Sequence, residues 1–354
     1  MNRIPSLDGL RCISCLLVVF GHSRLEPYNL NLGNLGVRIF FVISAYLIIG
    51  ILYKDIKKKQ FSIRKFYFKR IMRTFPAYYT YLFITGLFLS FINYFEWNQF
   101  WRSIFYLENY HPRGLWTEKQ WFVGHSWSLA VEEQFYIISA LIFSLFNKKI
   151  LNKKTLNIIF LSTIIIVPFI KLAYIFGKDF FPKILLQSTG RSFETVADAL
   201  AVGGIIYLNE NKIRSLKIFQ FFAKYIYICL VSIIIIEIFR SELIPLELKF
   251  EFKIIYYFIG QTLINIIIGT IILTTIKYQP NESFFARVLN NRFSIKIGMM
   301  SYSIYLWQQI WLYNWNIHMI VKYLGIILTA SISYYFIEKP FLKFRDKLLQ
   351  RTVY

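Results

Sequence analysis

The sequence is poor in cysteine and in charged side chains. It has three cysteines, charged residues make up 17% of its 354 positions, and only 19 residues are Asp or Glu. Cys12, Cys15 and Cys229 all lie in apolar stretches, so they are predicted to be small core residues rather than metal ligands or redox groups. A soluble domain averages about 25% charged residues. The low charge therefore excludes an ordinary soluble domain.

Three motifs of nucleotide and hydrolytic chemistry are also missing. The sequence has no Gly-x-x-x-x-Gly-Lys-Ser/Thr loop, no Gly-x-Ser-x-Gly nucleophile elbow and no His-Glu-x-x-His motif. The first absence argues against ATP-driven transport, and the other two argue against serine or zinc hydrolysis. No metal ion is expected.

Apolar residues are abundant instead, at 56% of the chain, with a mean hydropathy of +0.47. This excess excludes disorder and points to a polytopic membrane protein. The runs are continuously apolar rather than alternating, which favours helices over a barrel. We expect a single all-α integral membrane domain over residues 1–354 with about ten transmembrane helices. The predicted spans are residues 7–23, 36–53, 75–95, 126–146, 156–176, 193–208, 218–239, 252–276, 295–317 and 319–338.

The net charge of +22 is explained by topology. Nucleic-acid binding would need a soluble body that carries the basic face, so no nucleic-acid partner is expected. Lys and Arg collect in cytoplasmic loops. With the N-terminus placed inside, 26 of the 41 basic residues lie in cytoplasmic segments and nine in outer loops. We therefore predict that both termini are cytoplasmic.

The largest predicted outer loop, residues 96–125, is rich in aromatic side chains. Trp and Tyr favour the depth of the lipid headgroups, so one interpretation is an interfacial belt. The other is a platform on which sugar rings stack. The aromatic residues concerned are Trp97, Trp101, Tyr106, Tyr110, Trp116 and Trp121.

Two ionisable residues stand in the first predicted helix. Arg11 and His22 are eleven positions apart, which is three turns plus roughly 20°, so they share one face about 16 Å apart. Ionisable groups in a bilayer mark functional sites. The alternatives are that Arg11 extends to the inner headgroups and that His22 is a hydrogen-bonded interfacial histidine.

The fourth predicted helix carries the adjacent carboxylates Glu132 and Glu133. Neighbouring helical residues point about 100° apart, so we expect only one of the two to face a small site. Because this helix runs inward, the glutamates are expected near the depth of His22, where a carboxylate would orient the imidazole as a general base. Alternatively, both are paired with Arg or backbone groups.

A third pair precedes the third predicted helix. If the stretch is helical, Arg70 and Arg73 at i, i+3 are neighbours on its cytoplasmic side. Two guanidinium groups suit phosphate, which they bind bidentately. General positive-inside bias or binding of anionic lipids would explain the same pair.

These residues resemble the acyltransferase 3 family of integral membrane O-acyltransferases. Six short strings occur in the family's order over nearly the whole chain. They are Leu7-Asp8-Gly9-Leu10-Arg11 with His22, residues 36–44, Arg70-Ile71-Met72-Arg73, Trp127-Ser128-Leu129 running into Glu132-Glu133-Gln134-Phe135-Tyr136, residues 301–307, and Glu338-Lys339-Pro340. Two positions depart from the family pattern: Ala45 replaces a usual Gly, and Gln308 stands where a His often occurs.

The resemblance implies a ten-helix O-acetyltransferase of the bacterial cytoplasmic membrane. Acetyl would move from cytoplasmic acetyl-CoA to a hydroxyl of a cell-surface carbohydrate, such as the O-antigen of lipopolysaccharide, capsule, exopolysaccharide or peptidoglycan. It implies that Arg11 and His22 are catalytic and that Arg70 and Arg73 bind the donor. Glu132 and Glu133 are expected to be catalytic as well. The matched residues Asp8, Trp127, Ser128 and Tyr302 are expected to contact substrate. The extracytoplasmic domain that some members append is not expected.

Other functions remain open at this point. A secondary transporter or flippase for lipid-linked sugars would explain ten helices with buried charges, although the sequence shows no paired inverted halves. An acyltransferase with a lipid, peptide or antibiotic acceptor would explain the same residues. A membrane scaffold would leave Arg11, His22 and Glu133 unexplained. The acceptor sugar, the acyl chain and the oligomeric state do not follow from the sequence.

Overall fold

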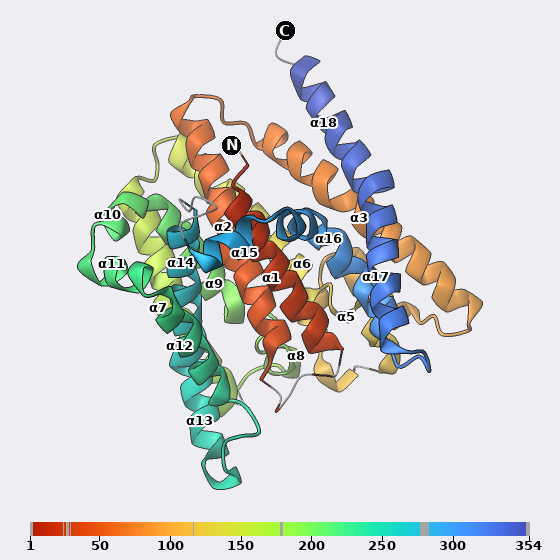
Figure 1. Cartoon of the computed structure of the whole chain (residues 1–354). Helices are drawn as coiled ribbons and strands as arrows, with labels where there is room; N and C mark the ends of the chain where they lie inside the picture. The colour runs from red at the N-terminus through yellow and green to blue at the C-terminus, as the bar shows by residue number, and fades with distance from the viewer. Residues whose placement is uncertain are drawn as a thin grey trace.

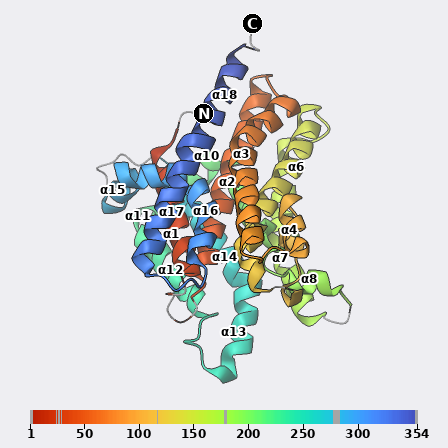
Figure 2. The same cartoon turned by 90° about the vertical axis from the view of Figure 1, so that its right-hand side faces the viewer.

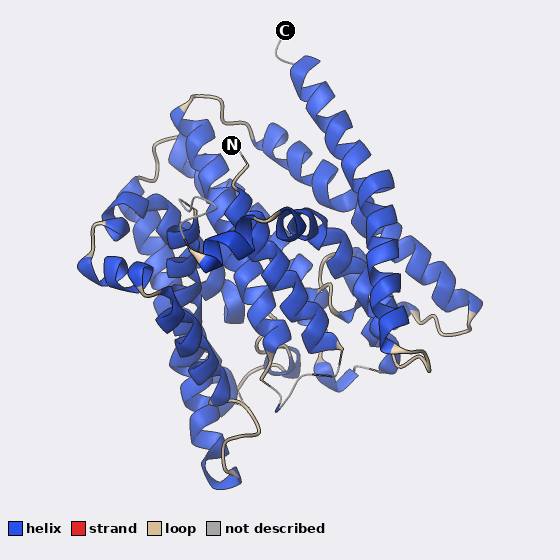
Figure 3. Cartoon of the chain, in the orientation of Figure 1, coloured by secondary structure: helices blue, strands red, loops and turns tan. Residues whose placement is uncertain are grey.

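The computed structural model describes residues 3–23, 25, 28, 30–115, 117–177, 180–276 and 283–351. Across these residues the chain forms helices and their connections, and no strand (Figure 3). The all-helical prediction is therefore confirmed. Trp116, one of the aromatic residues of the predicted outer loop, lies outside the described residues.

Helices occupy all ten predicted ranges. The long helices are α1 (Pro5–His22), α2 (Leu32–Lys57), α3 (Ile63–Phe91), α6 (Trp127–Asn147), α7 (Lys153–Phe176), α9 (Phe193–Leu208), α12 (Ile226–Ile238), α14 (Gln261–Thr275), α16 (Arg292–Leu312), α17 (Met319–Ser333) and α18 (Lys339–Arg351). The shorter ones are α4 (Trp97–Ile104), α5 (Trp121–Gly124), α8 (Lys183–Gln187), α10 (Glu210–Arg214), α11 (Lys217–Lys224), α13 (Lys249–Ile255) and α15 (Phe284–Asn290).

Several helix boundaries differ from the predicted ones because local signals outside the apolar runs set them. The Ser62 side chain caps α3 by accepting from the Lys65 amide at 3.2 Å, so this helix starts 12 residues before the predicted span at 75. Its first half therefore includes the Arg70 and Arg73 pair. At the other end of the chain, α16 ends at Leu312 rather than at 317.

Five helical segments are long and apolar enough to cross a membrane. They are Leu32–Lys57, Glu118–Asn147, Lys153–Phe176, Leu246–Thr275 and Met319–Gln350. A sixth arises if α11 and α12, which meet at 88°, form one broken span. The predicted span 218–239 thus falls on two helices rather than one. These segments support a multi-pass membrane protein, while the full count of ten spans stays a prediction.

The centre of the bundle is built on α1, α2, α9 and α16. Helix α1 packs against both α2 and α16, and α2 in turn packs against α9 (Figure 1). The most apolar window of α2 is 72% buried, whereas that of α7 is only 28% buried. A helix that is apolar on every side is expected either inside a bundle or inside a membrane. Because other helices cover little of α7, its exposed apolar side is the surface that a lipid bilayer would cover.

Both described ends of the chain lie at one end of the bundle. Figures 1 and 2 show the start of α1 and the whole of α18 at the same end. Helix α17 continues through the π-helix η7 (Tyr334–Glu338) into α18, which packs against α3. This arrangement agrees with two termini on one side of the membrane.

Glycine allows α1 and α16 to approach each other closely. A Cβ atom added at Gly298 of α16 would overlap the backbone carbonyl group of Asp8 in α1. Only glycine fits this crossing, because any side chain would have to push one helix away. The crossing also fixes the first turns of α1, which carry Arg11.

We expect Gly298→Ala to destabilise the protein. Overpacking of this kind costs typically 1–3 kcal/mol, and we expect the apparent melting temperature in detergent to fall. The matched control is Gly86→Ala in α3, where a new Cβ would lie 3.7 Å from its nearest neighbour, in the Phe100 ring. This control should keep or raise the melting temperature, since alanine favours a helix over glycine. Equal melting temperatures for both variants would contradict the close crossing.

Candidate active site

A cavity of about 250 Å³ lies between α1, α2, α3, α6 and α16. Ligand sites commonly measure about 300–1,000 Å³, so this cavity would hold part of a large ligand rather than all of it. It brings together residues that are up to 302 positions apart, from Arg3 to Tyr305. Eight of the ten predicted site residues line it: Asp8, Arg11, Arg70, Arg73, Ser128, Glu132, Glu133 and Tyr302.

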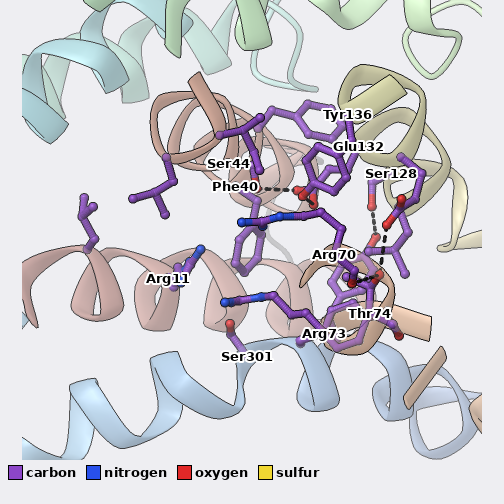
Figure 4. A pocket seen from close by; sticks show the side chains of 18 of the residues that line it. Arg11, Phe40, Ser44, Arg70, Arg73, Thr74, Ser128, Glu132, Tyr136 and Ser301 are labelled. Atoms are coloured by element: carbon purple, nitrogen blue, oxygen red, sulfur yellow. Dashed lines mark hydrogen bonds between the residues drawn. The ribbon is translucent and has the colours of Figure 1, made fainter. Parts of the chain in front are cut away.

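Three guanidinium groups meet in this cavity. Figure 4 shows Arg70 and Arg73 from α3 reaching toward Arg11 of α1. Arg73 is close enough to both other arginines for their like charges to repel. The Arg70 guanidinium lies between two rings, 5.8 Å from that of Phe66 and 5.7 Å from that of Tyr136, and its buried Nε has no partner in the described part of the chain. Such a cluster is suited to an anion.

The carboxylates Glu132 and Glu133 occupy different sides of the same cavity. Glu132 accepts hydrogen bonds from the hydroxyl groups of Ser44 at 2.9 Å and of Tyr136 at 2.8 Å. Glu133 accepts one from the Thr74 hydroxyl at 3.1 Å. Helix α6 is thereby joined to α2 through one glutamate and to α3 through the other.

Two expectations about these glutamates are corrected by this geometry. The sequence predicted that adjacent carboxylates do not both face one site, but the cavity curves around α6 and both line it. The glutamates were also expected to orient His22, yet their hydrogen bonds go to Ser44, Tyr136 and Thr74. The cause is the register of α6, since Glu132 lies seven residues, or about 10 Å, beyond His125.

Asp8 holds the arginines at the start of α1. Its carboxylate accepts from Nε of Arg3 at 2.6 Å and lies 3.7 Å from a guanidinium nitrogen of Arg11. Both partners line the cavity as well. Asp8 lines the cavity with its two oxygens directed at these two arginines, and its expected contact with substrate stays a prediction. Its contribution is to position the Arg11 side chain.

His22 lies at the opposite end of α1, outside the lining of the cavity. Its ring meets the ring of Trp121 edge-on, with centroids 6.0 Å apart, and the amide side chain of Gln308 lies beside it. His125 is close enough to interact electrostatically with it. The sequence thus placed Arg11 and His22 correctly on one continuous helix, but the neighbours of His22 come from α5, α16 and the start of α6.

A pair of hydroxyl groups separates the cavity from the surroundings of His22. Ser128 and Tyr305 both line the cavity, and their oxygens lie 2.6 Å apart. The Tyr305 hydroxyl also donates to the backbone carbonyl of His125 at 2.7 Å, and the two rings lie 5.3 Å apart. Tyr305 therefore has the cavity on one side and His125 on the other.

Trp127 and Tyr302, which were also expected to contact substrate, both contact other residues of the protein. Trp127 does not line the cavity but packs against the ring of Phe41 at 6.0 Å. Tyr302 does line it, and its hydroxyl donates to the Thr74 carbonyl at 2.9 Å. This hydrogen bond joins α16 to α3 at the level of the arginines.

Five residues near the cavity were not among the predicted site residues, although Tyr106 was named as an aromatic residue of the predicted outer loop. Ser44, Tyr305 and Glu338 lie within the quoted strings, and Thr74 directly follows Arg73, so proximity to a recognised motif was the available signal. Glu338 is buried, accepts from the Ser303 hydroxyl at 3.1 Å and interacts with Arg73 and Arg11. Tyr106 had no such signal, because it reaches the cavity from the predicted outer loop.

That predicted loop folds back into the bundle. Tyr106 stacks on the rings of Tyr78 at 4.6 Å and of Phe75 at 5.6 Å. Glu108 is fully buried, accepts from Ser103 and Gln120 and contacts His111 at 3.2 Å. Burial raises the pKa of Glu108, while the contacts with His111 and Ser103 oppose the rise. Tyr106 and Glu108 are thus packed inside, and Trp121 stands beside His22 rather than on an open platform.

No group of three or more His, Cys, Asp or Glu side chains that could hold a metal ion occurs in the described ranges. The three cysteines are free and buried.

Comparison with known proteins identifies a shared domain. Residues 4–337 match the acyltransferase 3 family model, described as an acyltransferase domain. A Bacillus subtilis protein named "Putative peptidoglycan O-acetyltransferase YrhL" is 27% identical over 381 residues, which cover 95% of this chain and 54% of that protein. Peptidoglycan O-acetyltransferase OatA of Listeria monocytogenes is 28% identical over 387 residues, 96% of this chain and 56% of that protein. The chain thus spans about half the length of these relatives. No solved structure matches significantly.

Proposed function

The chain belongs to the acyltransferase 3 family, and we propose that it is a multi-pass O-acetyltransferase of the bacterial cytoplasmic membrane. It would move acetyl from cytoplasmic acetyl-CoA to a hydroxyl of a cell-surface glycan. The observation that carries this proposal is the position of Arg11, in the second turn of α1, and of His22, its last residue, about 16 Å apart along one helix. Arg11 lies in an arginine-lined cavity, and His22 lies beyond its far wall. Such an arrangement suits a donor and an acceptor that arrive from opposite sides.

The donor side follows from the charge of the cavity. Acetyl-CoA carries phosphate groups, and guanidinium groups bind phosphate oxygens in pairs. In the proposal Arg70 and Arg73 hold the donor phosphates, and the pantetheine arm extends past Arg11 toward Ser128 and Tyr305. Glu132 is close enough to Arg11, and Glu133 to Arg70, for their opposite charges to attract.

In the proposal the chemical step takes place near His22, at the side of the cavity formed by Ser128 and Tyr305. His22 would remove the proton from the acceptor hydroxyl, and the oxygen would attack the thioester carbonyl. The carbon–sulfur bond then breaks, the acetyl ester forms, and the proton passes from His22 to the departing thiolate of CoA. A polar group beside the carbonyl would stabilise the developing oxyanion, an effect worth a few kcal/mol. Arg11, or the Tyr305 hydroxyl at the wall, is proposed for this role.

The acceptor is proposed to be a glycan of the cell envelope. The two relatives described above are named for peptidoglycan, which supports a glycan acceptor outside the cytoplasmic membrane. O-antigen, capsule and exopolysaccharide offer the same chemistry, a sugar hydroxyl, and remain within the proposal. Membrane lipid surrounds the protein in each case.

Deleting the gene tests the function as a whole. We expect envelope glycans extracted from the deletion strain to lack an acetyl increment that mass spectrometry detects in the parent, and a plasmid copy to restore it. Purified protein in liposomes with labelled acetyl-CoA then distinguishes an enzyme from a carrier. Movement of glycan across the bilayer without transfer of label would contradict the proposal, as would unchanged acetylation in the deletion strain.

A further inference from the structure

The surroundings of His22 contain buried polar atoms that have no hydrogen-bond partner. They are Nδ1 of His22, both ring nitrogens of His125 and the amide oxygens of Gln308 and Gln309. His125, Gln308 and Gln309 are 4%, 0% and 3% exposed. The backbone of Leu306 lies near the His125 ring, but no hydrogen bond of normal geometry forms. Leaving buried polar groups unpaired is costly, so several in one place need an explanation.

These atoms come from different helices but gather at one end of α1. Gln308 lies beside the His22 ring, and His125 interacts with it electrostatically. Trp121 stands edge-on to His22, and its ring nitrogen donates to the Gln309 carbonyl at 2.8 Å. The Gln308 nitrogen donates to the Tyr305 carbonyl at 3.3 Å. The Gln308 amide also lies within reach of the His22 ring, but its oxygen forms no hydrogen bond of normal geometry there.

The polar side chains around His22 are neutral, whereas many of those that line the cavity are charged. The cavity is lined by four arginines and three carboxylates. Around His22 the polar neighbours are the Gln308 amide and the His125 imidazole, next to the indole of Trp121, whose nitrogen donates to the Gln309 backbone carbonyl. Amide oxygens accept hydrogen bonds, and an imidazole either accepts or donates. A fitting ligand is therefore uncharged, offers several hydroxyl groups and has an apolar face.

We propose that His125, Gln308 and Gln309 form the subsite that binds the acceptor sugar. This proposal rests on the proposed function and specifies its acceptor side. The two amide oxygens accept from hydroxyl groups of the sugar ring, and His125 makes a third contact. The reacting hydroxyl then faces His22, while Trp121 covers one side of the ring. A site that is built to pair hydroxyl groups discriminates strongly against ligands that lack them.

The test uses substitutions that keep volume but remove the acceptor atom. Gln308→Met and Gln309→Met are made in the full chain, in the organism that carries the gene. Base-labile acetyl on envelope glycans is measured, together with the melting-temperature shift that acetyl-CoA produces in the purified proteins. The matched control is Gln261→Met in α14, another buried glutamine whose amide oxygen has no partner.

We expect each of the two variants to lower glycan acetylation by about tenfold and to keep the acetyl-CoA shift. The melting temperature of Gln309→Met should not fall, because the oxygen removed has no partner in the free protein. Gln308→Met also loses the hydrogen bond from its nitrogen to the Tyr305 carbonyl, so a small fall is expected for that variant. Gln261→Met should acetylate like the parent. Near-parental acetylation by both variants, or an equal loss in Gln261→Met, would overturn the subsite. If the parent strain itself shows no gene-dependent acetylation, the proposed function fails and the subsite fails with it.

Discussion

Replacing His22 with alanine is expected to lower acetyl transfer to glycan by about 10²–10⁴-fold, the usual contribution of a general base. The imidazole is the group proposed to take the hydroxyl proton, and water is a poor substitute at a partly buried position. Transfer of labelled acetyl from acetyl-CoA measures the loss. The variant should still show the acetyl-CoA melting-temperature shift, because His22 does not line the donor cavity.

A histidine elsewhere provides the control for this result. His318 is exposed and caps α17 through a hydrogen bond from the Ile320 amide at 3.3 Å. His318→Ala should transfer acetyl at close to the parental rate. Parental transfer by His22→Ala, in protein that still shows the acetyl-CoA shift, would exclude His22 as the base.

Changing Arg70 or Arg73 to lysine is expected to raise the KM for acetyl-CoA by about 10–100-fold, since charged hydrogen bonds contribute about 1.5–3 kcal/mol. Lysine keeps the charge but loses the planar pair of donors that matches a phosphate group. The kcat should change less, because these residues are proposed to hold the donor away from the reacting carbonyl. Steady-state kinetics with varied acetyl-CoA separates the two quantities.

Arg102→Lys is the matched control for this substitution. Arg102 stacks on the ring of Trp101 at 4.6 Å and is not part of the cavity lining. It should leave the KM for acetyl-CoA unchanged. A fall in kcat with no change in KM for Arg70→Lys would instead place that residue at the chemical step.

The local features of the site could be predicted from sequence because helix geometry determines them. Arg70 and Arg73 at i, i+3 do lie on one helix and in one cavity, and Arg11 and His22 do share one helix. Caps such as Ser62 lie outside the apolar runs, so hydropathy alone placed the start of that helix too late. The helix type was thus easier to predict than its ends.

Relations between helices were harder to predict because they depend on tilt and register. The sequence offered Glu132 and Glu133 as neighbours of His22, but packing of α6 places His125 there instead. Similarly, hydropathy assigned Tyr106 to an outer loop, and only the return of that segment into the bundle brings its ring to the cavity. These contacts are set by long-range packing, which a single sequence does not encode in a readable pattern.

The hydrogen bonds of Tyr305 have a consequence for the membrane itself. A continuous polar path between cavity and outer surface would conduct protons and ions, and each charge that crosses releases about 2.3 kcal/mol per 100 mV of membrane potential. Tyr305 is buried, and its hydroxyl is engaged with Ser128 and with the His125 carbonyl. In the proposed topology Tyr305 interrupts the polar path and so prevents ions and protons from leaking. The acetyl group, which carries no charge, is transferred from one side to the other.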